Sequence, residues 1–517
     1  MLYVSRTVPP SLTLPIAKEI DERITKCIFR ISTGFDIDQL PYHPSGIHEN
    51  GGIASREMLI KRLLLWVPSC ERNVLSQWVG VFALIGPALS KIIPLDVLLG
   101  DPIDEFTRPT EPRIPEAHRV CIIPELEDAL STLKNRRAHD GVTALHPHLS
   151  FPGDDEVTVS KLLRLGKKGY SSRLHAEALA DDTHVLLTKI ESYNDVIPEL
   201  VSIAISSAND HQWFHAHPAV PGFQMDASTW RHTMCMIFGL PIWDFSQRVQ
   251  KEMMEPDTTC RCCKAPMGTF AAYGFHAMNC IHLAGCKTRR HDAIRDKLLA
   301  MIETFTSEFH TRSQFTTLRE PTYDHLFPGL RIRPLPLAPA PQVFTYRDLH
   351  GNIREKTPGD PVRGDLGFSK DRVQTIYDIT IPSDTRTDVQ TNHITLKTRD
   401  RITKSAECGK GEKFHKAFNL ESDKNQHFKG AAIGSAGAMG TGMNQLLSHI
   451  ANLVTADTSE GEVGGDSARG RVITQLRQAV QITLMRGNSL CFNSWITRCC
   501  VGNYRYSRNY FVEGDDD

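Results

Sequence analysis

Five cysteines lie in one short stretch, "CRCCKAPMGTFAAYGFHAMNCIHLAGC", residues 260–286. Zinc takes about four sulfur or nitrogen ligands, often as two close pairs separated by a loop. Cys260 with Cys263 gives one pair, although Cys262 can replace Cys263, and His276 with Cys280 gives the other. Clustered thiols in a reducing compartment indicate metal rather than disulfides. We therefore expect a structural zinc site, against the alternative of scattered core thiols. Two further residues are spare ligand candidates: Cys286 and His291.

Two aspartates further along have the chemistry of a hydrolytic metal site. Asp365 lies in "VRGDLGF" and Asp378 lies thirteen positions later in "IYDITI". This spacing suits two adjacent strands joined by a short turn, "SKDRVQ", with both carboxylates at one end of a sheet. Two oxygen ligands at one point suit Mg²⁺, which lowers the pKa of a bound water and offsets charge on a scissile phosphate. Lys410 or Lys413, one helical turn apart, can lie over that phosphate. The alternative is two surface aspartates and a solvated basic helix.

The segment between the two clusters is a candidate nucleic-acid contact. The formal net charge of the chain is −1, so any surface for nucleic acid must be local. The stretch "KTRRHDAIRDK" concentrates cations that can contact DNA phosphates, namely Lys287, Arg289, Arg290 and Arg295. No apolar run approaches a membrane span, and the N-terminus lacks a signal-peptide pattern. We expect a nuclear or cytoplasmic protein with no membrane partner.

Periodicity predicts the elements that position these residues. Residues 12–32 read as a helix with isoleucines every fourth residue, and "REMLIKRLLLW" as a second helix. Asp226 or Ser228 is a candidate helix cap before "TWRHTMCMIF". "RRHDAIRDKLLAMIETF" is an amphipathic helix whose apolar face comprises Ile294, Leu298, Met301, Ile302 and Phe305. "TIYDITI" alternates as a strand, and "RVITQLRQAVQITLM" is a helix. We expect a Pro- and charge-rich linker at 101–120, a loose Gly-rich loop over 429–470 around the helix "MNQLLSHIANLV", and a disordered acidic tail.

Three other motifs look chemical but have simpler interpretations. The pair Asp181 and Asp182 in "LADDTHVLL" resembles the metal-binding motif of a polymerase, yet we interpret it as a helix-start or surface pair. "GSAGAMGTG" lacks the buried strand and spacing of a dinucleotide-binding loop. "HQWFHAHP" suggests metal, but Trp213 and Phe214 among its histidines favour a packed turn.

The ordered series of motifs resembles the C-terminal region of non-LTR retrotransposon proteins that carry a zinc knuckle and a restriction-like endonuclease. The series comprises "SSANDHQWFHAHPAVPGFQMDASTWRHTMCMIFGLPI", the C-x-x-C and G-x-H-x-x-x-C pairs, "RRHDAIRDKL", Glu320-Pro321, "VRGDLGF", "IYDITI", "AECGKGEKF" and "RQAVQITLMRGNS". The opening "AKEIDERITKCIFRISTG…GGIAS" resembles the thumb-side sequence that follows the polymerase palm. The chain differs from the family at three places: Gly364 replaces a proline, Phe414 replaces a tyrosine, and two glycines lie in the lysine helix.

This resemblance implies a fold and a function. It implies a nuclease fold of the PD-(D/E)XK type, in which Asp365 and Asp378 bind Mg²⁺ and Lys410 or Lys413, displaced onto a helix, assists the attacking water. The first hypothesis is a DNA endonuclease module that nicks target DNA and lacks the polymerase core. The second is a catalytically inactive, zinc-stapled nucleic-acid-binding remnant. Reverse-transcriptase activity is not expected from this chain alone. The implied partners are DNA, element RNA and a full-length retroelement protein.

The expected fold class is α+β. We expect a mostly helical N-terminal half, a small zinc knuckle, and an α/β restriction-endonuclease-like domain with a mixed central sheet. The expected boundaries are a helical thumb-like remnant (1–120), a helical connector (121–250), the CCHC zinc knuckle with its basic helix (251–300), the endonuclease domain (301–490) and a tail (491–517).

Overall fold

The protein is an α+β chain, mostly helical, with a small four-stranded mixed sheet. The computed structural model describes residues 10–34, 36–39, 56–67, 69–92, 126, 128–129, 170–193, 198–208, 210–220, 222–240, 259–260, 263–265, 275–309, 315–321, 344–347, 353–356, 364–370, 373–385, 394–418, 428–456 and 465–500. The expected linker at 101–120 and the acidic tail lie outside these residues. The chain divides into two compact units, Met1–Ser192 and Tyr193–Asp517.

The first unit is helical throughout its described residues. Its elements are α2 (Pro10–Thr33), the short η1 (Ile37–Gln39), α3 (Arg56–Trp66), α4 (Cys70–Ile92) and α8 (Tyr170–Glu191). The predicted helix over 12–32 is confirmed, but its isoleucines do not form the buried face. Ile16 is 57% exposed, whereas Ala17 and Phe29 are fully buried. Asp21, also buried, caps α4 by accepting hydrogen bonds from the Cys70 backbone N–H (2.7 Å) and from Ser69 Oγ (2.8 Å).

Asp181 and Asp182 lie inside α8, so the predicted helix start is wrong. Asp182 forms an ion pair with Arg72 of α4 at 3.1 Å, and the Arg72 side chain is only 5% exposed. A buried guanidinium needs such a partner, because an uncompensated charge in the interior is costly. Asp182 therefore contributes to packing between α4 and α8 and does not form the β-turn that a polymerase metal motif requires.

The second unit combines helices with two small sheets. Its helices are α9 (Pro198–Ser207), η4 (Gln212–His215), α10 (Ala227–Phe238), α12 (Phe275–Asn279), η6 (Ile281–Leu283), α13 (Ala284–Glu308), α15 (Arg401–Phe418), α16 (Thr441–Val454) and α17 (Gly465–Cys500). Its strands are β1 (Phe315–Arg319), β2 (Phe344–Arg347), β3 (Ile353–Lys356), β4 (Leu366–Lys370), β5 (Val373–Thr380) and β6 (Phe428–Ala432). β2 and β3 form a separate antiparallel pair.

The four-stranded sheet has the order β1-β4-β5-β6. β1 with β4 and β4 with β5 are antiparallel, whereas β5 and β6 are parallel. The predicted strand "TIYDITI" is confirmed as β5, but both of its faces are buried: Ile376 is 1% exposed on one face and Tyr377 is 1% exposed on the other. Helix α15 approaches the first face and α16 approaches the second, where Tyr377 Oη contacts His449 Nδ1 at 3.2 Å.

The loose loop predicted for 429–470 is wrong in its first part. Residues 428–432 form β6, and the following turn "IGSAGAMG" is almost entirely buried. Ser435 and Ala436 donate hydrogen bonds to the buried carboxylate of Asp384, the latter at 2.5 Å. Glycine and alanine carry little β-propensity, so this buried edge strand has a weak sequence signal.

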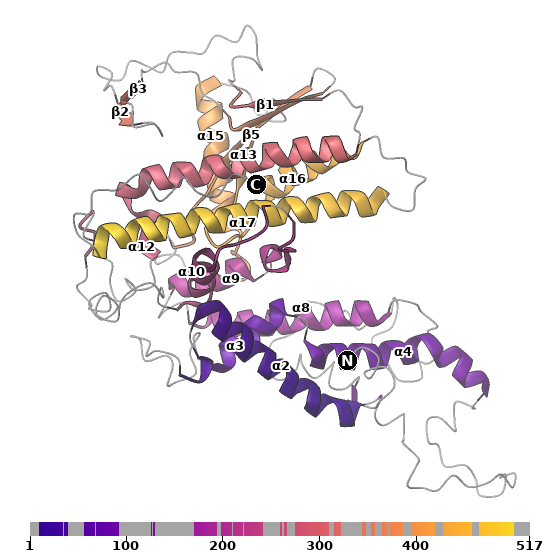
Figure 1. Ribbon diagram of the computed structural model, residues 1–517. Coiled ribbons are helices and arrows are strands. Elements are labelled where there is room, and N and C mark those ends of the chain that lie inside the picture. Colours follow the sequence, from indigo (N-terminus) through magenta and orange to yellow (C-terminus); the bar gives the residue numbers. More distant parts are fainter. Residues whose placement is uncertain are drawn as a thin grey trace, which may run out of the picture. The chain divides into compact units, whose positions relative to one another are not determined.

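The two longest helices of the second unit, α13 and α17, run side by side (Figure 1). Polar contacts along their length show that they are antiparallel: Cys286 reaches Ser494 near one end, and Glu308 pairs with Arg471 near the other. The predicted apolar face of α13 is buried as expected. Helix α17 runs without interruption through residue 490, where we expected a boundary.

Two further predictions are confirmed: the cap at the start of α10 and the packed turn in "HQWFHAHP". Asp226 caps α10 by accepting from the Thr229 backbone N–H at 2.8 Å, and Gly239 ends the helix in the left-handed conformation with φ 70°. The "HQWFHAHP" segment is a packed turn: Trp213 is 2% exposed, and its backbone N–H donates to Gln481 of α17. Within the described part of the chain, no helix is both long and apolar enough to cross a bilayer.

Candidate functional site

The β4–β5 hairpin brings the two predicted aspartates together. Leu366 pairs with Tyr377 in the antiparallel register, so Asp365, directly before β4, lies beside Asp378 of β5. The Asp365 backbone N–H donates to the Tyr377 carbonyl at 2.9 Å. The two carboxyl groups are close enough for each to shift the pKa of the other. Both residues are 8% exposed, so the interpretation as two surface aspartates is wrong.

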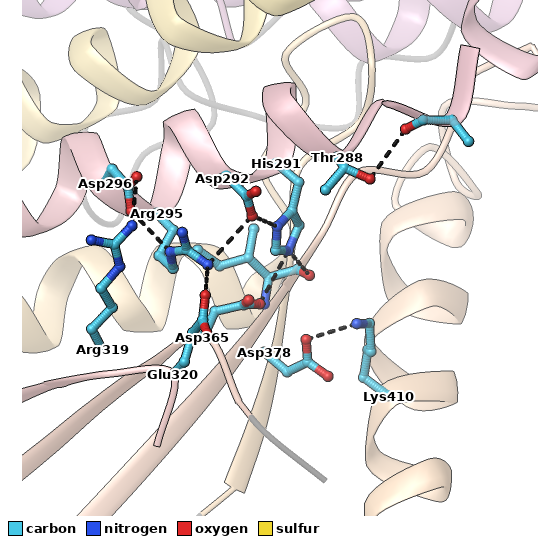
Figure 2. Close-up of polar contacts among 12 residues, drawn as sticks. Thr288, His291, Asp292, Arg295, Asp296, Arg319, Glu320, Asp365, Asp378 and Lys410 are labelled. Atoms are coloured by element: carbon cyan, nitrogen blue, oxygen red, sulfur yellow. Dashed lines mark hydrogen bonds and ion pairs between the residues drawn. The ribbon is translucent and has the colours of Figure 1, made fainter. Parts of the chain in front are cut away.

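Helix α15 adds a cation to this pair. Lys410 Nζ lies 2.7 Å from Asp378 Oδ1, and its side chain is 27% exposed. Figure 2 shows the lysine extending from its helix toward the carboxylate. Of the two candidate lysines, the structure places Lys410 at the carboxylates; the side chain of Lys413 lies outside the described residues. Two carboxylates and a lysine therefore converge from two strands and one helix.

Close backbone packing fixes the position of α15. The register partner of Asp378 is Gly430 of β6, and a Cβ at Gly430 would lie 2.7 Å from the carbonyl oxygen of Glu407. The Glu407 side chain of α15 also accepts hydrogen bonds from the backbone N–H groups of Ala432 (3.0 Å) and Gly442 (2.9 Å). This carboxylate joins α15 to both β6 and α16. Lys410, one turn further along α15, is therefore held at a defined height above the sheet.

The pKa values of the two aspartates are shifted in opposite directions. Burial raises the pKa of Asp378 to about 6, with repulsion from Asp365 adding to burial and Lys410 opposing both. Burial also acts to raise the pKa of Asp365, but hydrogen bonding and attraction to His291 outweigh it and lower the pKa. Clusters of buried titratable groups with divergent pKa values are typical of functional sites.

His291 of α13 is part of this cluster rather than of the zinc site. Its Nε2 lies 3.2 Å from Asp365 Oδ2 and 3.1 Å from the carbonyl oxygen of Ile379 (Figure 2). Its Nδ1 lies 3.3 Å from Asp292 Oδ1. Burial acts to lower the pKa of His291, but the hydrogen bonds and attraction to Asp365 raise it to about 9.

The four cations predicted to contact DNA divide into two pairs. Arg290 and Arg295 are buried, at 4% and 5% exposure. Arg290 donates to Asn488 of α17 at 2.6 Å, and Arg295 pairs with carboxylates of its own helix and with Glu320 after β1. Their guanidinium groups are engaged inside the unit, which removes them from the predicted contact set.

Lys287 and Arg289 remain as candidate nucleic-acid contacts. Lys287 is half-buried, and burial followed by repulsion from Arg290 lowers its pKa. Arg289 is exposed. Both precede His291 on the same helix, within about one turn of it.

The predicted zinc ligands also converge. One ligand atom from each of Cys260, Cys263, His276 and Cys280 lies within 4.8 Å of all the others. Cys263 Sγ lies 3.1 Å from His276 Nε2. Three sulfurs and one nitrogen at these separations fit the donor set and size of a tetrahedral zinc site, so this cluster can hold a metal ion. Cys262 lies outside the described residues, and the spare candidate Cys286 hydrogen-bonds Ser494 instead.

Local backbone structure positions the four ligands. The Lys264 N–H donates to the Cys260 carbonyl at 2.7 Å, and Lys264, directly after the second ligand Cys263, adopts φ 61°. The short helix α12 presents His276, and its carbonyl accepts from the Cys280 N–H at 2.8 Å. Burial raises the pKa of the Cys280 thiol to about 12, with the neighbouring thiols adding to the rise. A cation would offset this cost, because zinc binds the thiolate form.

The metal cluster is connected to the sheet. Asn279 lies between two of its ligands and donates to the Thr385 carbonyl at 3.3 Å, just beyond the end of β5. Arg290, at the start of α13, also contacts Met278 Sδ of α12 at 3.2 Å. The cluster therefore lies at the N-terminal end of the helix that carries His291.

No protein-family model matches this chain, and no curated protein is significantly similar to it. A functional assignment therefore depends on the geometry of the two clusters and on the order of motifs in the sequence.

Reasoning from the residues alone missed two members of the site. The sequence suggests His291 only as a spare zinc ligand. Glu407 carried no signal, because a glutamate on an expected basic helix is typical of a solvated face. Only the fold shows that both have partners on the sheet.

Proposed function

We propose that the protein is a metal-dependent DNA endonuclease that hydrolyses a phosphodiester bond at the Asp365–Asp378–Lys410 cluster. The observation that carries the proposal is the convergence of the two carboxylates with a lysine on one side of a mixed sheet. This is the set of groups that PD-(D/E)XK nucleases use, and the order of motifs supports the same family. The proposed fold of the second unit is accordingly a restriction-endonuclease-like domain.

The donor set fits a hard divalent cation. Asp365 and Asp378 supply carboxylate oxygens, and the Ile379 carbonyl lies beside Asp365, 3.1 Å from the same His291 nitrogen. Bound Mg²⁺ supplies an acidic site that lowers the pKa of a water and offsets phosphate charge. Asp365, whose pKa is held below its usual range by His291, provides a negative charge for that cation. Lys410 donates to Asp378 and can donate equally to the attacking water or to a phosphate oxygen.

The Cys₃His cluster has a structural role in this proposal. It holds zinc as a staple at the start of α13, which keeps Lys287, Arg289 and His291 on one ordered helix. The substrate would be DNA, contacted through phosphates by the two cations ahead of His291. Element RNA and a full-length retroelement protein are the other proposed partners.

A plasmid-nicking assay tests the proposal. Supercoiled plasmid is incubated with the full chain in Mg²⁺ or Mn²⁺, and the fraction converted to relaxed circles is measured by gel electrophoresis. We expect nicking by the parent protein and its loss in Asp378→Asn, which keeps the shape of the side chain but removes its charge. Lys410→Gln should reduce the rate and leave DNA binding intact. Glu303→Gln, at an exposed carboxylate of α13, is the matched control and should nick normally.

The second hypothesis predicts a different outcome of the same experiment. A zinc-stapled binding remnant would retard DNA in a salt-sensitive manner and nick it with neither cation. Nicking that survives Asp378→Asn would point to a contaminating nuclease and would remove the assignment.

A further inference from the structure

His291 can only donate hydrogen bonds in its present contacts. Its Nε2 faces the Asp365 Oδ2 and the Ile379 carbonyl oxygen, and its Nδ1 faces Asp292 Oδ1. All three atoms are acceptors, so each contact requires an N–H on the ring. The side chain is 27% exposed and spans the gap between α13 and the end of the sheet.

Two donors converge on a single oxygen of Asp365. Oδ2 accepts from the Ile379 backbone N–H at 2.6 Å and from His291 Nε2 at 3.2 Å. With Oδ2 engaged in this way, Oδ1 is the oxygen left to bind a cation. The plane of the carboxylate is therefore set by one contact from the backbone of β5 and one from a helix side chain.

Helix α13 is anchored on both sides of His291. Arg290, the preceding residue, is buried against Asn488, and Ile294 is fully buried three residues later. Arg295 Nη1 lies 3.3 Å from Asp292 Oδ1 and also pairs with the Glu320 carboxylate. The backbone N–H of Glu320 in turn donates to the Asp365 carbonyl at 3.1 Å. Helix α13 thus holds the main chain of Asp365 through Arg295 and Glu320, and the side chain of Asp365 through His291.

We propose that His291 is a positioning residue that orients the Asp365 carboxylate for a divalent cation. The role rests on the proposed nuclease function, because it concerns the same cation site. A donor that fixes one oxygen of a ligating carboxylate orients the other and reduces the entropy lost on binding; loss of such a partner commonly weakens metal binding about 10- to 100-fold. Helix α13 then carries a residue that serves the cation as well as the two proposed DNA contacts, Lys287 and Arg289.

Direct measurement of cation binding tests this role without relying on turnover. Mn²⁺ is titrated into the zinc-loaded full chain without DNA, and free Mn²⁺ is measured by electron paramagnetic resonance. We expect His291→Ala to raise the dissociation constant about 10- to 100-fold. His291→Gln, whose amide nitrogen can donate from a similar position, should recover part of the loss. Thr288→Ala, at an exposed residue one turn earlier on α13, should bind as the parent does.

The outcomes separate this role from folding and from the proposed function. Zinc content and thermal unfolding are measured on every variant. Unchanged Mn²⁺ affinity in His291→Ala would overturn the positioning role and leave the nuclease proposal intact. Equal losses in the alanine and glutamine variants, with a lower unfolding temperature in both, would show a structural role instead and would also overturn it. If the parent shows no Mn²⁺ binding that Asp378→Asn weakens, the proposed function fails and this role fails with it.

Discussion

Gly364, the residue before Asp365, gives a sharp test of the packing beneath the carboxylates. A Cβ at this position would lie 2.2 Å from Ile376 Cγ2 and 3.3 Å from the Tyr377 carbonyl oxygen. Its φ is not in the left-handed region, so the cost of Gly364→Ala is steric. Ordinary carbon contacts begin near 3.5–4 Å, so Ile376 must move by roughly 1.5 Å.

The Ile376 side chain has little free space into which it can move. Ile376 is 1% exposed and lies two residues before Asp378, on the same face of β5. Overpacking of a filled core costs about 1–3 kcal/mol, and we expect Gly364→Ala to lower the free energy of unfolding by that amount. Gly364→Pro should cost more, because it also removes the hydrogen bond from the Gly364 N–H to the Pro321 carbonyl.

Urea unfolding followed by circular dichroism measures both effects. The matched control is Gly409→Ala on α15, where a Cβ would meet nothing within 4 Å. Because glycine in a helix interior is less stable than alanine by about 1 kcal/mol, this control should gain stability. If Gly364→Ala were as stable as the parent while Gly409→Ala behaved as expected, the close packing of Gly364 against β5 would be refuted.

Three further predictions concern other parts of the second unit. Cys280→Ser should abolish the binding of about one zinc per chain, measured by elemental analysis, and lower the unfolding temperature. Glu407→Met, which keeps the length of the side chain but removes its acceptor, should lower the free energy of unfolding by about 1–3 kcal/mol in urea, because two backbone N–H groups lose their partner. Burial, with His215 adding to it, lowers the pKa of His211 to about 4. The unfolded chain therefore binds more protons as pH falls from about 6.5 toward 4, and stability falls with it; His211→Asn should lessen this fall in unfolding measured at pH 7 and pH 5.

Contacts that depend on local spacing could be predicted from the sequence. The proximity of Asp365 and Asp378 follows from a hairpin of two short strands, and the Cys260–Cys263 and His276–Cys280 pairs follow from one turn each. In these cases the partners are close in the chain, so a turn and a periodicity are sufficient to place them.

Contacts that depend on distant partners could not be predicted. Arg290 looks like a DNA contact on any helical projection, yet Asn488, almost two hundred residues away, makes it part of the interior. The isoleucines of α2 have a strong helical period, but the face that packs is the one with Ala17 and the capping residue Asp21. The period of a pattern identifies a helix, whereas the neighbouring elements decide which side is buried.

The parallel pairing of β5 and β6 has a consequence for how this site can vary. Parallel neighbours require a crossover connection, and here α15 is that connection. The crossover passes over the Asp378 face of the sheet, so Lys410 lies on the crossover helix and not on a strand. The lysine can thus be separated from its aspartate by any length of chain that still lets the helix cross. A search that requires a fixed aspartate–lysine interval would miss the site, while a search for a carboxylate pair followed by a strand–helix–strand unit would retrieve it.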